Sequence, residues 1–171
     1  MPPWQRGQAA ANALRQTLGL GAQPLDDQSL ADLLQIEATR LITPPEAVSP
    51  PIGLAVRNSS DTEWKLLFRK WNRPARRFEA ARFIADYVFS EPDDRWLPIT
   101  DTATARQKQQ RAFAAEFLCP IESLRKYLGD QFSPEALDDA AHHFGVSELA
   151  VRSQLEKHDL IPARLLHATL S

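Results

Sequence analysis

The positions of the prolines are the feature that most limits how this 171-residue chain can fold. Four of them lie between residues 43 and 51, where the missing amide hydrogen and the clash with the preceding turn exclude a helix. We therefore expect residues 43–51 to form a linker. Further prolines predict a loop over 91–100, and Pro120 ends a helix that we expect over 101–118.

Helix start signals and apolar periodicity place the other regular elements. Asn72 is a favourable N-cap and Pro74 is tolerated in a first turn, so a helix is predicted over 73–90. Two apolar runs joined by the turn sequence SSDT predict a β-hairpin over 52–70. These elements predict an α+β fold in which helix far exceeds strand. The remaining helices are expected at 4–18, at 28–36, as a pair within 133–158, and as a short one from Pro162.

Length and composition favour one domain spanning 1–171. With 43% hydrophobic residues, the chain can bury a single ordinary core. The one cysteine, Cys119, cannot form an internal disulfide, which is typical of a reducing cytoplasm. The net charge of −2 does not indicate general nucleic-acid binding, and no apolar stretch has the length of a signal peptide or a membrane span. We expect a cytoplasmic protein without a membrane partner.

Segments along most of the chain resemble one protein family. The string RAFAAEFLCP, residues 111–120, is similar to the Phe-Ala-Ala-Glu-Leu-Leu-hydrophobic-Pro signature of the ImmA/IrrE family of metallopeptidases. FGVSELAVRSQLEKHDLI, residues 144–161, resembles the C-terminal helix pair of that family, and ALRQTLGL, residues 13–20, resembles its first helix. RRFEAARFIADYVF, residues 76–89, begins like the zinc helix of the family. The resemblance implies a mainly helical, zincin-like peptidase domain with a small antiparallel sheet and a helix-turn-helix-like pair at its C-terminal end.

The zinc ligands of that family are missing from this chain. A zinc peptidase needs two histidines one helical turn apart and a glutamate base, but no histidine precedes His142. Arginine stays protonated and phenylalanine has no basic atom, so neither can replace these groups. We therefore expect a domain that is catalytically inactive and that holds no metal or other cofactor. The family's ligand and base positions are occupied here by Arg82, Phe83, Asp86 and Gln107.

Two of these positions suggest what replaces the zinc site. Arg82 and Asp86 lie four residues apart on the predicted helix and can pair as guanidinium and carboxylate. The pair is either an ordinary surface ion pair or a filling of the volume that zinc and its ligands take in the family. The family resemblance favours the second interpretation.

Two acid–imidazole pairs raise the question of another metal site. His142 and His143 each follow an aspartate by four residues, Asp138 and Asp139. Neighbours on a helix point about 100° apart, so the two pairs would not share one ion. We interpret them as pairs that stabilise a helix surface.

A basic segment is the clearest candidate for partner binding. Residues 65–82 hold seven Lys or Arg and one Glu, so the segment carries 7 − 1 = +6 in a chain of net charge −2. Such a surface could contact phosphates or an acidic protein, or it could be an edge strand whose cations discourage edge-to-edge pairing. The candidate residues are Lys65, Arg69, Lys70, Arg73, Arg76 and Arg77.

Functions of different classes follow from these features. The family resemblance implies a bacterial or phage regulator, in a stress response or on a mobile element, that binds a helix-turn-helix repressor-like protein without cleaving it. The alternative is a nucleic-acid-binding module that uses the basic segment 65–82 and the C-terminal helix pair, whose second helix would offer Arg152, Gln154 and Lys157 to a groove. A weaker alternative is a metallopeptidase with non-standard ligands.

Overall fold

The fold comes from a computed structural model, which describes residues 1–43, 50–57 and 64–162. The architecture is α+β and mainly helical, as the sequence predicted. The strands are β1 (Gly53–Val56), β2 (Lys65–Leu67) and β3 (Trp96–Ile99). The helices are α1 (Pro3–Thr17), α2 (Asp27–Leu34), α3 (Thr39–Ile42), α4 (Arg73–Phe89), α5 (Ala105–Leu118), α6 (Ile121–Leu128), α7 (Pro134–Phe144) and α8 (Glu148–Lys157).

The predicted start of α4 is confirmed by a side chain that accepts a free amide of its first turn, whereas α5 begins at Ala105, four residues after its predicted start. Asn72 accepts a hydrogen bond from the main-chain nitrogen of Ala75 at 2.9 Å, which fixes the start of α4. Ser133 and Ser147 cap α7 and α8 in the same way. Parts of other predicted features lie outside the described residues: most of the linker 43–51, the hairpin turn at 59–62, and the short helix after Pro162.

The sheet has the strand order β2-β1-β3, and the predicted hairpin is present as the antiparallel pair β1–β2. The loop predicted over 91–100 is wrong, because this segment contains β3, in which Pro98 pairs with Leu54. Proline lacks an amide donor and is tolerated on an edge strand, which is where β3 lies. The sequence prediction also missed α6, which begins directly after Pro120.

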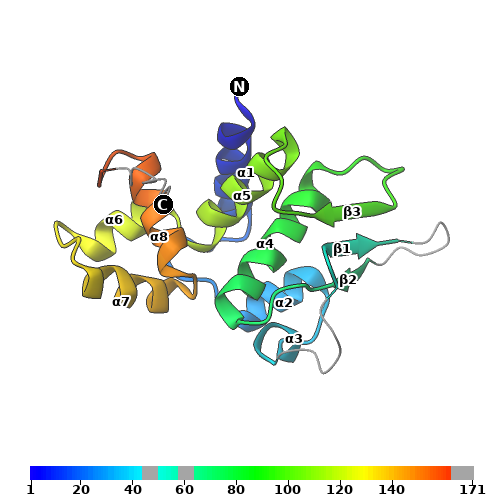
Figure 1. The fold of residues 1–171 in the computed structure, drawn as a ribbon, viewed down its shortest axis with the longest axis horizontal. Coiled ribbons are helices and arrows are strands. Elements are labelled where there is room, and N and C mark those ends of the chain that lie inside the picture. The colour runs from blue at the N-terminus through cyan, green and yellow to red at the C-terminus, as the bar shows by residue number, and fades with distance from the viewer. Residues whose placement is uncertain (44–49, 58–63, 163–171) are drawn as a thin grey trace, which may run out of the picture.

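The core is built around α5, whose apolar side chains are buried. Figure 1 shows α1, α4 and α5 in the centre, with the sheet on one side and α6, α7 and α8 on the other. Phe113 and Phe117 are fully buried on α5, and their rings stack with centroids 5.3 Å apart. Leu118 and Ala114 are also fully buried.

Helices α1 and α5 approach closely because α1 carries a glycine at the crossing. A Cβ atom on Gly7 would overlap the main-chain oxygen of Gln109 and would lie 3.0 Å from the main-chain nitrogen of Phe113. The absence of a side chain at this position therefore lets the two backbones meet.

Among the described residues, no helix is long and apolar enough to cross a membrane.

Candidate functional site

The candidate site is a buried polar network between α4 and α5. Arg82 and Asp86 lie one turn apart on α4 and are only 4% and 3% exposed. Gln107 and Gln110, one turn apart on α5, are buried as well. Three of the four positions that the family resemblance singled out, Arg82, Asp86 and Gln107, therefore lie in the same buried region.

Arg82 is held by oxygen atoms from α5 and from the segment before it. Its Nη2 donates to the main-chain oxygen of Thr100 at 2.6 Å and to Oε1 of Gln110 at 3.1 Å. The same nitrogen donates to Oε1 of Gln107. Gln107 is fixed in turn, because its Nε2 donates to the main-chain oxygen of Pro98 at 3.2 Å. The guanidinium thus ties α4 to the strand end and to α5.

The charge of Asp86 is compensated mainly by side chains of α5. Its Oδ1 accepts hydrogen bonds from Nε of Arg106 at 3.1 Å and from Nε2 of Gln110, and it lies 3.0 Å from Nη2 of Arg106. The predicted direct pairing of Arg82 with Asp86 needs correction, because within the described residues Gln110 stands between the two groups. The amide of Gln110 accepts from Arg82 and donates to Asp86, so it relays the interaction.

Burial shifts both charged groups towards their neutral forms. Desolvation lowers the pKa of Arg82 to about 10, with a further lowering from Arg111. Desolvation also raises the pKa of Asp86, although Arg106 and Gln110 oppose that shift. Nε of Arg82 and Oδ2 of Asp86 are buried without a partner among the described residues. The network therefore contains charge that is only partly compensated.

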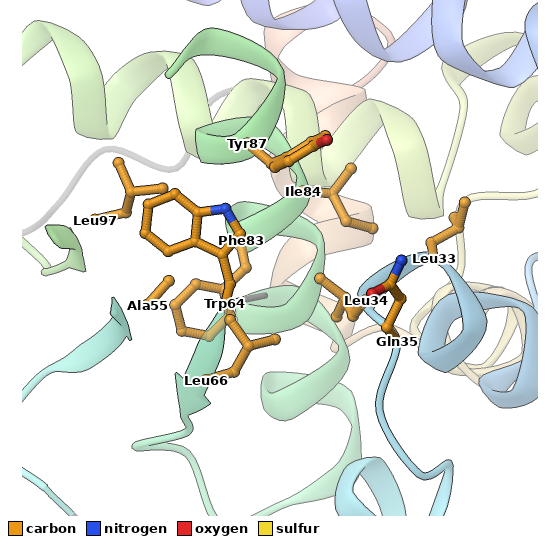
Figure 2. A pocket seen from close by; sticks show the side chains of 10 residues that line it. All are labelled: Leu33, Leu34, Gln35, Ala55, Trp64, Leu66, Phe83, Ile84, Tyr87 and Leu97. Atoms are coloured by element: carbon orange, nitrogen blue, oxygen red, sulfur yellow. The ribbon is translucent and has the colours of Figure 1, made fainter. Parts of the chain in front are cut away.

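Phe83 does not belong to this network. It lies on another face of α4, where its ring meets that of Phe68 edge to face at 5.5 Å. Figure 2 shows Phe83 among apolar side chains that include Ala55, Leu66 and Leu97 of the sheet. At the position that the resemblance aligns with a catalytic glutamate, this chain therefore has a core side chain.

The residues of the network do not fit a zinc ion. Guanidinium cannot ligate a metal. Of the four network residues Arg82, Asp86, Gln107 and Gln110, only Asp86 carries a carboxylate. Among all described residues, no three His, Cys, Asp or Glu side chains lie together in a way that could hold a metal ion.

Of the two predicted acid–imidazole pairs on the surface of α7, the one between His142 and Asp138 is confirmed. Nδ1 of His142 is 3.5 Å from Oδ2 of Asp138, and both side chains are well exposed. His143 instead stacks on Tyr127 of α6 at 4.3 Å. The two imidazoles therefore serve different helix contacts.

Two of the six predicted partner-binding residues are inside the protein. Arg76 and Arg77 are 2% and 1% exposed. Nε of Arg76 donates to the main-chain oxygen of Lys70 at 2.9 Å, and Nε of Arg77 donates to that of Gly145, also at 2.9 Å. Arg77 also pairs with Asp27 at the start of α2. These arginines join segments that are distant in sequence and cannot contact a partner directly.

The other four predicted cations are Lys65 on β2 and, between β2 and the start of α4, Arg69, Lys70 and Arg73. We call Arg69, Lys70, Trp71 and Arg73, together with Lys65, the basic loop. Arg69 pairs with Asp101 at 2.7 Å, and Arg73 pairs with Asp27 at 2.8 Å. Trp71 is 52% exposed between these cations. Glu79 on α4 fixes the main chain of this loop. Its Oε2 accepts hydrogen bonds from the main-chain nitrogens of Arg69 at 2.9 Å and Lys70 at 3.1 Å.

The C-terminal helix pair is arranged less favourably for reading DNA than the sequence suggested. Gln154, one of the three residues offered to a groove, is 1% exposed. Its Nε2 donates to Oε2 of Glu116 at 3.0 Å and to the main-chain oxygen of Cys119 at 3.1 Å. Arg152 lies 3.8 Å from Glu148 on the same helix. The side chain of Gln154 thus anchors α8 to α5.

Sequence reasoning missed Gln110 and Arg106, which complete the network. A signal for Gln110 was available, because it lies one turn after Gln107 and so shares its face of the helix.

The chain matches no model of a known protein family, and a comparison with curated proteins finds no significant match.

Proposed function

We propose that this protein is a catalytically inactive, ImmA/IrrE-like regulator that acts by binding another protein. The proposed partner is a helix-turn-helix repressor-like protein of a bacterium or phage, in a stress response or on a mobile element, and the proposed compartment is the cytoplasm. The observation that carries the proposal is the buried network on α4. The side chains that stand where the resemblance puts zinc ligands are all engaged in hydrogen bonds within the domain.

The basic loop is the surface that best suits a protein partner. An exposed tryptophan flanked by cations has the composition of a binding hot spot, because Trp and Arg dominate the binding energy of many interfaces. The amides of Arg69 and Lys70 are fixed by Glu79, so the main chain of the loop is ordered before binding. Both Arg69 and Arg73 are already partly neutralised by acids of this chain, which favours a partner with a local acidic patch over a polyanion.

The test is binding of the purified protein to a panel of purified helix-turn-helix repressors, measured by biolayer interferometry. We expect Trp71→Ala to weaken the interaction by at least about tenfold, as for a hot-spot residue. The matched control is Trp96→Ala, because Trp96 is a similarly exposed tryptophan, 64% accessible, on the opposite edge of the sheet. This control should leave the affinity unchanged.

Three results would contradict the proposal. EDTA should not change the affinity of the natural protein, so abolition of binding by EDTA would implicate a metal. The partner should stay intact on a gel after long incubation, and specific cleavage would restore the metallopeptidase alternative. Tight, salt-sensitive binding to DNA without affinity for any repressor would favour the nucleic-acid module instead.

A further inference from the structure

The carboxylate of Asp101 lies among three cations that come from another part of the chain. Asp101 is in the short segment between β3 and α5. Its Oδ2 is 2.7 Å from Nη2 of Arg69 and 3.8 Å from Nζ of Lys70. Its Oδ1 lies 4.0 Å from Nη1 of Arg82 on α4. Two cations that precede α4 and one that lies on it therefore converge on a single carboxylate.

The charges around this carboxylate do not cancel. Three positive charges face one negative charge, which leaves 3 − 1 = +2. Two further groups that act on the charge of Arg82 are Arg111 and Glu79, which have opposite signs and offset each other. Asp86 acts on Arg82 as well, but it is already paired with Arg106. A second anion with up to two charges would therefore balance the cluster.

The Asp101 side chain is the most accessible member of this cluster. It is 63% exposed, whereas the side chains of Arg69 and Lys70 are 19% and 38% exposed. Exposed ion pairs are weak, so rotation of this carboxylate into solvent costs little free energy. Arg69 and Lys70 can then contact a ligand that displaces Asp101. Arg82 is only 4% exposed and acts on such a ligand from behind, through its charge.

The main chain on both sides of the cluster is fixed, although the central carboxylate is not. The hydrogen bonds from Glu79 hold Arg69 and Lys70. On the other side, the main-chain oxygen of Thr100 accepts from Arg82, and its nitrogen donates to Oε1 of a buried glutamine at 3.2 Å. Within the described residues, the Asp101 carboxylate accepts a hydrogen bond only from Arg69. The cations are thus positioned in advance, which lowers the entropic cost of binding an anion between them.

A phosphate monoester matches the chemistry of this cluster. At neutral pH its phosphate carries a charge of about −1.5 to −2 and three strong acceptor oxygens. Guanidinium groups bind phosphate oxygens through paired hydrogen bonds, and lysine binds them as a point charge. We propose that Arg69 and Lys70, backed by Arg82, bind a phosphate monoester group that displaces the carboxylate of Asp101. The site shares two residues with the basic loop but does not require the proposed repressor-like partner, so its test uses no repressor.

The first test compares two probes of the same shape and different charge. Methyl phosphate and methyl sulfate have equal numbers of heavy atoms, but methyl sulfate carries only one negative charge. Titration of the full chain at low salt, followed by calorimetry and by NMR of the protein amides, should show saturable binding of methyl phosphate. Its affinity should exceed that of methyl sulfate roughly fivefold, the ratio for one more unit charge close to a cation in water. Equal affinity for the two probes would overturn the proposal.

A change of Asp101 tests the displacement. Asp101→Asn keeps the size of the side chain and removes the competing charge, so the affinity for methyl phosphate should rise about three- to tenfold. The matched control is Asp130→Asn, because Asp130 is exposed and forms no ion pair among the described residues. An equal gain in both variants would show an effect of net charge alone and would overturn the role of Asp101. Absence of binding in both the natural protein and Asp101→Asn would overturn the site itself.

Two further variants locate the contacts. In the Asp101→Asn background, Arg69→Gln and Lys70→Gln should each weaken binding of methyl phosphate at least about fivefold, as expected for the loss of a charge-assisted hydrogen bond. Melting temperatures identify the folded variants, and either one alone is sufficient for the test. Unchanged affinity in a folded Arg69→Gln or Lys70→Gln variant would overturn the assignment of that cation.

A peptide arm distinguishes the sources of the phosphate group. A short peptide with one phosphoserine is compared with methyl phosphate and with the same peptide without the phosphate. Tighter binding of the phosphopeptide than of methyl phosphate supports the site and assigns the group to a phosphorylated protein. Equal binding of these two probes supports the site and assigns the group to a free phosphate ester. Equal binding of the phosphorylated and unphosphorylated peptides would overturn the proposal.

Discussion

The relay through Gln110 predicts how strongly Arg82 and Asp86 are coupled in their contributions to the free energy of unfolding. The lowering of the Arg82 pKa to about 10 corresponds to roughly 3 kcal/mol of unfavourable free energy for the buried charge. Its hydrogen bonds to Thr100, Gln107 and Gln110 oppose this cost, at about 1.5–3 kcal/mol for each bond to a charged group. Together the three bonds outweigh this cost, so we expect Arg82→Met to lower the free energy of unfolding by roughly 2–6 kcal/mol.

A double-mutant cycle isolates the coupling between the two groups. Arg82→Met and Asp86→Asn should interact by about 1–2 kcal/mol, within the usual range for residues of one network. When the cycle is repeated in a Gln110→Leu background, the coupling should fall to less than half, because the relay is gone and only the through-space attraction remains. Urea unfolding gives these energies, with a shift of roughly 0.5 M in the midpoint for each 1 kcal/mol.

Either of two results would refute this reasoning. Equal coupling in both backgrounds would mean that direct attraction between Arg82 and Asp86 is sufficient and that Gln110 is incidental. No coupling in the natural background would mean that the side chains do not act as a unit. Gln109→Leu on the same helix is the matched control, since Gln109 makes no hydrogen bond to Arg82 or Asp86 among those of the described residues.

Three further predictions concern stability. Gly7→Ala should destabilise the protein by roughly 1–3 kcal/mol in thermal melts, because the steric overlap with α5 exceeds the helix-propensity gain of about 1 kcal/mol; a stabilised variant would contradict the close crossing. Phe113→Ala should cost about 3–5 kcal/mol, and a near-neutral effect would argue against the core position. Burial raises the pKa of Glu79, so the natural protein should lose stability relative to Glu79→Gln as pH rises from about 4.5 through the raised pKa. A pH-independent difference would show that Glu79 is not strained by burial.

Local signals explain which parts of the fold were predictable. The cap at Asn72 and the break at Pro120 act through neighbouring backbone atoms, so the sequence placed the start of α4 and the end of α5 closely. Strand β3 depends on pairing with β1, which lies about 40 residues earlier in the chain, and such a non-local contact leaves no local sequence pattern. In addition, Pro98 is typical of a loop, so the local sequence did not indicate a strand.

The polar residues were harder to place for a related reason. Arginines are mostly exposed, so Arg76 and Arg77 were assigned to the surface. Their burial follows from acceptors that only the tertiary fold supplies, such as the main-chain oxygen of Gly145, 68 residues away from Arg77. Part of the candidate site was accessible through the family resemblance, which singled out Arg82, Asp86 and Gln107. The relay by Gln110 needed the relative placement of α4 and α5.

The burial of three arginines changes what the basic segment can do. Of its seven cations, Arg76, Arg77 and Arg82 are buried, which leaves 7 − 3 = 4 on the surface. If these four alone contacted B-DNA, the slope of log affinity against log salt would be no steeper than about −3.6, from −0.9 per phosphate contact. We expect at most this weak dependence in fluorescence anisotropy with duplex DNA. A steeper slope would put the DNA contact on another surface. Because four partly paired cations give little affinity for a polyanion, we expect the proposed partner binding at this loop to depend more on the exposed ring of Trp71 than on net charge.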